Sequence, residues 1–321
     1  MLGSLFYRSI NRGTPHSGPW TLIWQCRTRA VMGDKAISEE DYLRWLLRDV
    51  AYADVADTDK DGRAQFSHIC DKAIIIYSRD KKNENDFFRY LKNFKDKLCV
   101  IVHLSDEFCT NPIKSYRYAS FVLRNYNRSG IPPHVRPFPL GCTLGKIPPD
   151  AFRPALPNER QYLWNFAGHA GPSKPHRQAA LDAFASLEPN FQHVTDSFHD
   201  SIRAALKPEE YCTVMGDSTF VLCPRGNKSL DCFRNYEAAM YGAIPVVVGE
   251  PQELKTTFIA PFDAPFLYAQ SWAEARHEVE SLLADPLALK RKQRDLLDWW
   301  ARWPGIIRDY LQQIETGSSG N

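Results

Sequence analysis

The sequence predicts an α/β protein built from two parallel, doubly wound sheets, with further helices near its carboxyl end. Short, almost continuously apolar runs alternate along the chain with segments of helical periodicity. A proline-rich joint at residues 147–160 divides this alternation into two blocks. Strands that are apolar throughout are typical of parallel sheets covered by helices on both faces. With 321 residues and 44% apolar side chains, the chain is long enough for two packed cores.

The first block predicts one of these sheets. Residues 38–50 have the periodicity of a helix, with Ser38 as its N-cap and Asp41 at its third position. A second helix is expected around residues 84–94. The expected strands are 21–26, 72–78, 97–104 and, with a less regular pattern, 120–126 and 135–141.

The second block repeats the alternation after the proline joint and predicts the other sheet. Its expected strands are 162–169, 191–197, 219–224 and 244–250, and its expected helices are 173–187, 208–218 and 234–242. The tail from Ser271 to Ile314 is helical in pattern. We expect Trp299, Trp300 and Trp303 in this tail to pack in the core or between the domains.

Composition excludes several classes of protein. The 40 Lys and Arg residues nearly balance the 38 Asp and Glu residues, so a general nucleic-acid binder with a basic face is not expected. No run approaches the length of a membrane span, and the amino terminus is a poor signal peptide. The eight cysteines form no C-x-x-C pair, which favours a reduced, cytoplasmic protein. A removed membrane anchor is the alternative. Against a secretory location, Asn227-Lys228-Ser229 is a glycosylation sequon, and a glycan there would obstruct the loop described next.

The loop after the expected strand 219–224 carries the strongest functional signal. In open α/β sheets, ligands bind beyond the carboxyl ends of the strands, and a helix begins just after this loop. Helix N-termini favour phosphate groups, and arginine matches phosphate oxygens with a bidentate fork. The residues that point to phosphate binding are Arg225, Gly226, Asn227, Lys228 and Ser229.

Arg234 and Glu237 follow on one face of the next helix, three residues apart. The alternative for this pair is a solvated ion pair within the helix. We expect Arg225, Lys228 and Arg234 to neutralise a diphosphate, and the Glu237 carboxylate to accept hydrogen bonds from ribose hydroxyls. The turn therefore predicts a site for a nucleotide diphosphate attached to a further group.

Residues 219–251, TFVLCPRGNKSLDCFRNYEAAMYGAIPVVVGEP, resemble the signature of exostosin-like glycosyltransferases, family 47 and its relatives. That signature reads F-x-L-x-P-x-G, then S-x-x-x-x-R-x-x-E-A, then G-x-I-P-V. Weaker matches at 102–107, 122–126, 139–141 and 164–169 are spaced as in the ribitol xylosyltransferase-like branch. The residues that match the signature are Phe220, Leu222, Pro224, Gly226, Ser229, Arg234, Glu237, Ala238, Gly242, Ile244, Pro245 and Val246.

The resemblance implies a GT-B fold, in which two Rossmann-like domains face a cleft. It implies an acceptor-side domain at 1–154, a nucleotide-sugar-binding domain at 155–285, and at 286–321 a helix packing across the domains with a flexible tail. The expected partners are a nucleotide-diphosphate sugar, with a UDP-sugar favoured, and the hydroxyl group of a glycan or glycoconjugate acceptor. The resemblance also implies inversion at the anomeric carbon, with the nucleotide-sugar as co-substrate and no tightly bound metal.

Inverting transfer needs a general base from the first domain. Asp106 and Glu107 follow the most hydrophobic strand of that domain, and Asp106 is slightly favoured over Glu107. His103 is the next candidate for the base, with a structural role as the alternative.

Other candidates lie beside the expected cleft. Gly168 and His169 resemble a glycine-rich loop that lets the backbone approach a diphosphate, although a simple turn is the alternative. Arg124 and Arg177 are further cleft candidates, with an exposed helix charge as the alternative for Arg177.

The segment DTDKDG at 57–62 begins like an EF-hand calcium loop, but His68 stands where the loop needs a bidentate glutamate. A solvated acidic turn is expected there instead.

Two other readings of the chain stay open. One is an α1,3-fucosyltransferase-like enzyme that uses GDP-fucose, although that family usually has T-E-K where Arg234-x-x-Glu237 stands. The other is a non-catalytic GT-B protein that binds glycans or acts as a scaffold. Retention of Asp106 and Glu107 argues against this second reading, because a protein without activity has no need of a base.

Overall fold

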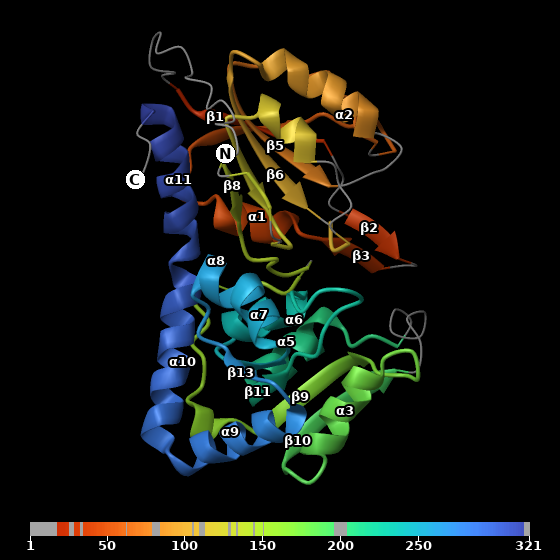
Figure 1. The fold of residues 1–321 in the computed structure, drawn as a ribbon, viewed down its shortest axis with the longest axis vertical. Helices are drawn as coiled ribbons and strands as arrows, with labels where there is room; N and C mark the ends of the chain where they lie inside the picture. The colour runs from red at the N-terminus through yellow and green to blue at the C-terminus, as the bar shows by residue number, and fades with distance from the viewer. Residues whose placement is uncertain are drawn as a thin grey trace, which may run out of the picture.

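The computed structural model describes residues 18–25, 29–32, 35–61, 63–78, 84–104, 106–108, 113–127, 130–132, 134–143, 145–149, 151–195 and 204–317. These residues form two parallel sheets, one above the other in Figure 1, and the last helices run along one side of both. The predicted α/β architecture is confirmed. The strands of the first sheet precede the proline-rich joint in the sequence and those of the second sheet follow it, as expected.

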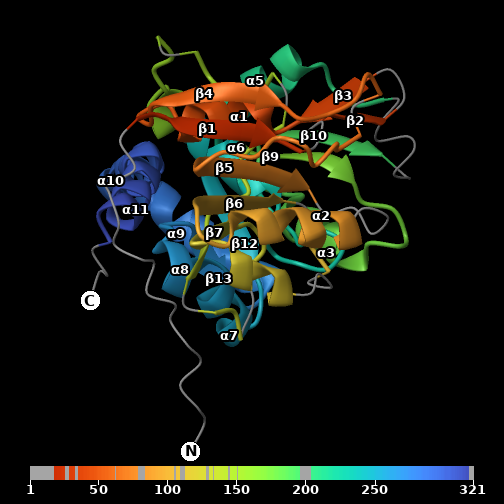
Figure 2. The same ribbon diagram turned by 90° about the horizontal axis from the view of Figure 1, so that it is seen from above.

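The first sheet has six parallel strands in the order β4-β1-β5-β6-β7-β8. Figure 2 shows the first five of these side by side. All seven residues of β6 are buried, which explains the continuous apolar run there. The strand bounds are Trp20–Trp24 (β1), Tyr52–Ala56 (β4), Lys72–Ser78 (β5), Leu98–Leu104 (β6), Phe121–Arg124 (β7) and Val135–Pro137 (β8).

One expectation for this half is wrong. Ser38 does not cap a helix, because it is the last residue of β3 (Lys35–Ser38), which pairs antiparallel with β2 (Arg29–Met32). Helix α1 instead spans Glu40–Leu46, preceded by Glu39. The other helical segments of this half are α2 (Glu84–Leu91), η1 (Lys92–Phe94) and η2 (Ile113–Tyr118).

Lys60 and Asp61 form an exposed turn, as expected for the 57–62 segment, but the first residue of the segment is buried. Asp57 is only 5% exposed. Its carboxylate accepts hydrogen bonds from the Gln25 side chain at 2.6 Å and from the backbone N–H groups of Ser67 and His68 at 2.8 and 2.9 Å. Asp57 therefore ties together the loop after β4, a long-range role that the local sequence does not reveal.

The second sheet has five parallel strands in the order β10-β9-β11-β12-β13. The strand bounds are Tyr162–His169 (β9), Asn190–Thr195 (β10), Ser218–Leu222 (β11), Ile244–Val248 (β12) and Leu267–Ala269 (β13). The helical segments are η3 (Pro157–Glu159), α3 (Pro175–Phe184), α5 (Pro208–Gly216), α6 (Phe233–Met240), α7 (Pro251–Leu254), the π-helical η4 (Lys255–Ile259) and α8 (Ala260–Phe262). The sequence analysis did not anticipate β13 or the segments from α7 to α8.

Three helices complete the chain, namely α9 (Trp272–Ala284), α10 (Pro286–Ala301) and α11 (Trp303–Thr316). In Figure 1, α10 lies beside the second sheet and α11 continues beside the first. Lys72 of β5 forms an ion pair with Glu315 of α11 at 2.8 Å. The ring of Phe121 in β7 lies 5.7 Å from that of Tyr310 in α11. The carboxyl-terminal helices therefore link the two sheets.

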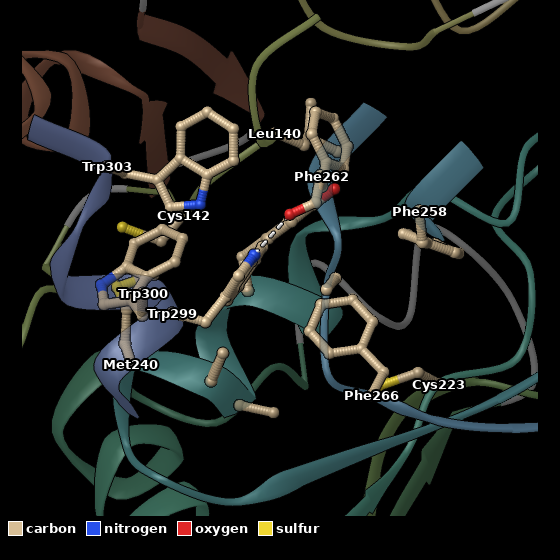
Figure 3. Packing of buried hydrophobic residues seen from close by; sticks show 14 of the residues in the cluster. Leu140, Cys142, Cys223, Met240, Phe258, Phe262, Phe266, Trp299, Trp300 and Trp303 are labelled. Carbon is tan, nitrogen blue, oxygen red and sulfur yellow. Dashed lines mark hydrogen bonds between the residues drawn. The ribbon is translucent and has the colours of Figure 1, made fainter. Parts of the chain in front are cut away.

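The predicted packing role of the tryptophans in this tail is confirmed. Trp299, Trp300 and Trp303 are 2%, 7% and 3% exposed, and Figure 3 shows them gathered among other apolar side chains. Trp300 stacks on Trp45 beyond the end of the first sheet, with ring centroids 4.9 Å apart. The Trp299 indole N–H donates to the Phe262 carbonyl oxygen at 2.8 Å, so its polar group is also satisfied.

Within the described part of the chain, no helix combines the length and apolar character needed to cross a bilayer. The cysteines described there are free thiols, namely Cys70, Cys99, Cys142, Cys212, Cys223 and Cys232.

Candidate functional site

Loops from both sheets meet at the carboxyl ends of their strands. In the first sheet, β6 ends at Leu104 and is followed by Asp106 and Glu107. In the second sheet, β11 ends at Leu222, and residues 223–232 form the loop that leads into α6. We call residues 223–232 the donor loop. Direct hydrogen bonds join Glu107 to this loop, so the predicted residues of the two halves form one site.

The Glu107 carboxylate lies against three successive backbone amides of the donor loop. Its Oε1 accepts hydrogen bonds from the N–H groups of Asn227, Lys228 and Ser229 at 2.8, 2.8 and 3.4 Å. Its Oε2 accepts from the Asn227 side-chain amide at 3.3 Å. Gly226 permits this approach, because a Cβ there would lie 2.9 Å from Oε1. Successive N–H groups of this kind form a concave site for anions.

Arg225 and Arg177 brace the start of the donor loop. The Arg225 guanidinium donates to the Glu253 carboxylate at 2.6 Å and to the Lys228 carbonyl oxygen at 3.0 Å. Arg177 of α3 donates to the carbonyl oxygens of His169 at 2.8 Å and of Arg225 at 3.2 and 3.3 Å. Arg177 therefore joins the end of β9 to the donor loop, and the alternative of an exposed helix charge is wrong.

The positive charges of this region interact. Burial, together with the nearby Arg234, lowers the pKa of Arg177 to about 10. Burial and the charge of Arg177 also lower the pKa of Lys174, whose ammonium group donates to the Asn227 side-chain oxygen at 2.8 Å. The neighbouring His176 has a lowered pKa, first through burial, and its ring lies 3.2 Å from the Arg225 carbonyl oxygen. Several positively charged side chains therefore lie close together at this site.

Arg234 extends from α6 beneath the end of β9. Its guanidinium donates to the Ala167 carbonyl oxygen at 2.8 Å and lies 4.8 Å from the centroid of the Phe166 ring. Gly168 has a φ of +152°, and a Cβ at this position would lie 2.7 Å from an Arg234 nitrogen. The glycine therefore makes room for Arg234. The Nε of Arg234 is buried and has no hydrogen-bond partner among the described residues.

Glu237 faces a different set of partners from Arg234. It is 2% exposed, and its carboxylate accepts from Lys146 at 2.9 Å and from the Tyr211 hydroxyl at 2.6 Å. The Lys146 ammonium lies 4.2 Å from the Tyr211 ring centroid. The alternative of a solvated ion pair within the helix is therefore wrong, because the buried Glu237 binds a residue just before the joint and one from α5.

Gly168 and His169 are the last two residues of β9, so the expected glycine-rich loop and the alternative of a simple turn are both wrong there. His169 is 8% exposed. Its ring nitrogens are 3.0 Å from the Thr195 carbonyl oxygen and 3.1 Å from the Ser173 hydroxyl oxygen. These contacts hold the loop after β9 against the end of β10. The structure thus places His169 beside the site as part of its frame.

Asp106, Arg124 and His103 form a separate buried cluster around Tyr116. Arg124 donates to the Asp106 carboxylate at 2.9 Å and to the Tyr116 hydroxyl at 3.0 Å. The side chains of Arg124 and Asp106 are 1% and 2% exposed. A His103 ring nitrogen makes a hydrogen bond with the same hydroxyl. Adjacent Asp106 and Glu107 therefore point in different directions, as expected, and only Glu107 contacts the donor loop.

Sequence reasoning missed two buried carboxyl groups near the site. Glu39 precedes α1 and is 8% exposed, and its Oε1 accepts no hydrogen bond from the described residues. Asp231 lies two residues before the start of α6, and its carboxylate accepts a hydrogen bond from the Tyr236 hydroxyl at 2.7 Å. Burial raises the pKa of each to about 7. Sequence position alone gives no sign of this burial, although Asp231 belongs to the loop that was singled out.

Comparison with known proteins identifies the family. The family model of the RXYLT1 C-terminal domain matches residues 150–316, more than half of the 321-residue chain. The chain belongs to the RXYLT1 C-terminal domain family. The matched segment contains the second sheet, the donor loop and the last three helices. The predicted resemblance to exostosin-like glycosyltransferases of the xylosyltransferase branch is therefore confirmed.

One curated relative matches a shorter part of the chain. Ribitol-5-phosphate xylosyltransferase 1 of Danio rerio is 28% identical over 117 residues, which are 33% of this chain and 26% of that protein. The alignment thus spans about a quarter of the relative's length.

One solved structure shares the fold over nearly the whole chain. An α-glucosyltransferase in complex with UDP has a TM-score of 0.56 at 11% identity, covering 93% of this chain and 100% of its own. Alr3699/HepE of Anabaena, in complex with UDP and glucose, has a TM-score of 0.49 at 11% identity, with coverage of 94% and 100%. At such identities the likeness to the first structure shows the fold alone, which is the predicted GT-B fold.

The buried carboxyl groups predict a pH dependence of stability. The folded-state pKa of Glu39 lies near 7, above its ordinary value of 4.5, so folding favours its protonated form. The contribution of protonated Glu39 to the free energy of unfolding is fully present below about pH 4.5. It is lost as the pH rises through about 7. Glu39→Gln should therefore raise the free energy of unfolding at about pH 8, on the order of 2 kcal/mol, and change it little at about pH 4.5.

Urea unfolding at both pH values measures this effect, and Glu278→Gln on the exposed face of α9 is the matched control. The tyrosines Tyr42 and Tyr126 lie near Glu39, but their raised pKa values keep them neutral over this range. Equal pH dependence in Glu39→Gln and the wild-type chain would contradict the assignment.

Proposed function

We propose that this member of the RXYLT1 C-terminal domain family transfers a sugar from a UDP-sugar to a hydroxyl group of a glycan or glycoconjugate acceptor. The observation that carries the proposal is the donor loop, where cations surround three successive backbone amides that bind the Glu107 carboxylate, just before the helix that bears Glu237. The name of the Danio rerio relative describes xylosyl transfer to ribitol 5-phosphate. Xylose is therefore the first sugar to test in the donor, and a ribitol phosphate is the first acceptor.

The donor diphosphate would bind at the donor loop. Arg225, Lys228 and Arg234 supply positive charge from the loop and from α6. Arg177 of α3 and Lys174, which precedes that helix, supply more. A diphosphate leaving group gains negative charge as its bond to the sugar breaks, so these cations stabilise the transition state more than the ground state. The end of β9 at Gly168 and His169 would close the other side, with Arg234 held beneath it.

Glu237 would orient the nucleoside. A carboxylate has room for about four hydrogen bonds, and the Glu237 oxygens receive one each from Lys146 and Tyr211. Two adjacent ribose hydroxyls can donate to the remaining lone pairs. Lys146 and Tyr211 would then fix the direction of the carboxylate, a positioning role outside the signature residues.

The base that we propose for the acceptor hydroxyl is Glu107. Asp106 was slightly favoured on sequence, but its carboxylate is held by Arg124 in a buried ion pair. Glu107 extends to the donor loop, beside the cations that would hold the diphosphate. In an inverting step, its carboxylate takes the hydroxyl proton, the hydroxyl oxygen bonds to the anomeric carbon from the opposite face, and UDP departs with the electron pair of the broken bond.

We also propose that the transfer needs no tightly bound metal. The cationic side chains of the site can balance a diphosphate, which is the task that a divalent ion performs in metal-dependent transferases. Among the described residues, no cluster of three or more His, Cys, Asp or Glu side chains has the arrangement of a metal site.

A thermal-shift panel of UDP, GDP, CMP and dTDP, with their common sugars and with or without EDTA, tests the donor class. Ligands that bind only the folded state raise the melting temperature. We expect stabilisation by UDP species that survives EDTA. Preference for GDP would contradict the donor assignment and favour the fucosyltransferase-like alternative, and loss with EDTA would contradict metal independence. No response to any nucleotide would favour the non-catalytic scaffold.

Arg234→Ala should weaken UDP binding by about 10- to 100-fold, because a charged hydrogen-bonding partner of the diphosphate is lost. Isothermal titration calorimetry measures the change. Arg294→Ala is the matched control, since this α10 arginine is exposed and pairs with its neighbour Asp295 at 3.7 Å. Equal affinities for UDP in Arg234→Ala and the control would remove Arg234 from the donor site.

Glu107→Gln should lower the transfer rate by roughly two to four orders of magnitude, the usual effect of losing a general base. UDP should still bind, because the amide substitution leaves the cations in place. Asp106→Asn is the comparison, with melting temperatures measured for both because Asp106 is part of a buried pair. Transfer that survives in Glu107→Gln but collapses in a folded Asp106→Asn variant would return the base role to Asp106.

A further inference from the structure

The contact between Glu107 and the donor loop has the form of an anion bound in its site. Three consecutive N–H groups converge on a single carboxylate oxygen, and the Gly226 N–H closes the turn by donating to the Ser229 carbonyl oxygen at 2.8 Å. The Glu107 carboxylate comes from the other sheet, about 120 residues away in the chain. It does not cap α6, which begins only at Phe233.

We propose that the backbone amides of Asn227, Lys228 and Ser229 are a phosphate site, and that Glu107 and the donor diphosphate compete for it. This inference rests on the proposed function, because it assigns the donor diphosphate to the donor loop. One set of N–H groups cannot direct its hydrogen bonds to a carboxylate and to a phosphate at the same place. Binding of the diphosphate therefore requires Glu107 to leave the amides.

The charges of the site favour this exchange. Glu107 brings a single negative charge to a region that contains Lys174, Arg177 and Lys228. Arg225 already has a carboxylate partner in Glu253. A diphosphate carries at least two negative charges and several acceptor oxygens, so it matches this set of cations better than one carboxylate.

The exchange would also supply the base at the right moment. While Glu107 accepts hydrogen bonds from three amides and from the Asn227 side chain, fewer of its lone pairs are open to an acceptor hydroxyl. A diphosphate that takes over the amides leaves the carboxylate beside the donor without these bonds. Donor binding would thereby release the base, and the acceptor would be deprotonated only when a donor is present.

Calorimetry with inorganic pyrophosphate and with UDP on the full chain tests the competition. An internal ligand lowers the apparent affinity for any external one, so Glu107→Gln should bind pyrophosphate about 10-fold more tightly than the wild-type chain. Glu107→Asp keeps the charge but shortens the side chain, and it should also bind pyrophosphate more tightly. Glu250→Gln, which removes an exposed charge at the start of α7, is the control for a general change of charge.

Unchanged or weaker pyrophosphate binding in both Glu107 variants would overturn the inference, as would an equal gain in Glu250→Gln. Glu107→Asp keeps the inference testable if Glu107→Gln does not fold, as judged by thermal unfolding. The proposed function fails separately. A gain in pyrophosphate affinity with no binding of UDP would support the anion site and contradict the donor assignment. If the wild-type chain transfers sugar but the Glu107 variants bind pyrophosphate no more tightly, the proposed function stands and the competition between Glu107 and the diphosphate is contradicted.

Discussion

Repulsion among cations is the constraint on which the arrangement of the site depends. Lys174, Arg177, Arg225, Lys228 and Arg234 meet at the carboxyl edge of the second sheet. Partly buried like charges raise the free energy of the folded chain unless acceptors surround them. Backbone carbonyl groups, the Asn227 side chain and Glu253 supply these acceptors. Glu107 comes from the other domain and adds a negative charge near Lys174 and Arg177.

This constraint connects the site to the packing far from it. Glu107 reaches the donor loop only if the two sheets keep their relative position. The carboxyl-terminal helices hold that position, since α10 packs in the second half and α11 bonds to β5 through Glu315 and Lys72. The stacked rings of Trp45 and Trp300 add apolar burial at the same junction. A domain rotation that moved Glu107 by a few ångströms would break its hydrogen bonds without disturbing either sheet.

Much of this was predictable from the sequence for physical reasons that differ between elements. Buried parallel strands such as β6 and β12 leave continuous apolar runs, and the donor loop carries its chemistry in consecutive residues. The edge strand β4 was missed because its residues are mostly exposed or half-buried and its pattern is therefore not apolar. Ser38 was misassigned because serine is a favourable N-cap residue, whereas in the structure Ser38 pairs with Arg29 in a hairpin. The local sequence pattern does not show this pairing.

The partners of the signature residues were the least predictable part of the site. Lys146 and Tyr211 bind Glu237 from segments 91 and 26 residues away, and nothing in their local sequence marks them. Glu39 likewise sits between a hairpin and a helix, where a glutamate is ordinarily solvated. Its burial is a product of tertiary packing.

The most direct test of the account is the anomeric configuration of the product, followed by proton NMR. The chain would be incubated with UDP-xylose and a ribitol phosphate, and UDP release would be measured in parallel. The account predicts a glycoside of configuration opposite to that of the donor, formed in step with UDP. A product that retains the donor configuration would contradict the inverting role of Glu107, and no product with any UDP-sugar would contradict the assignment as a transferase.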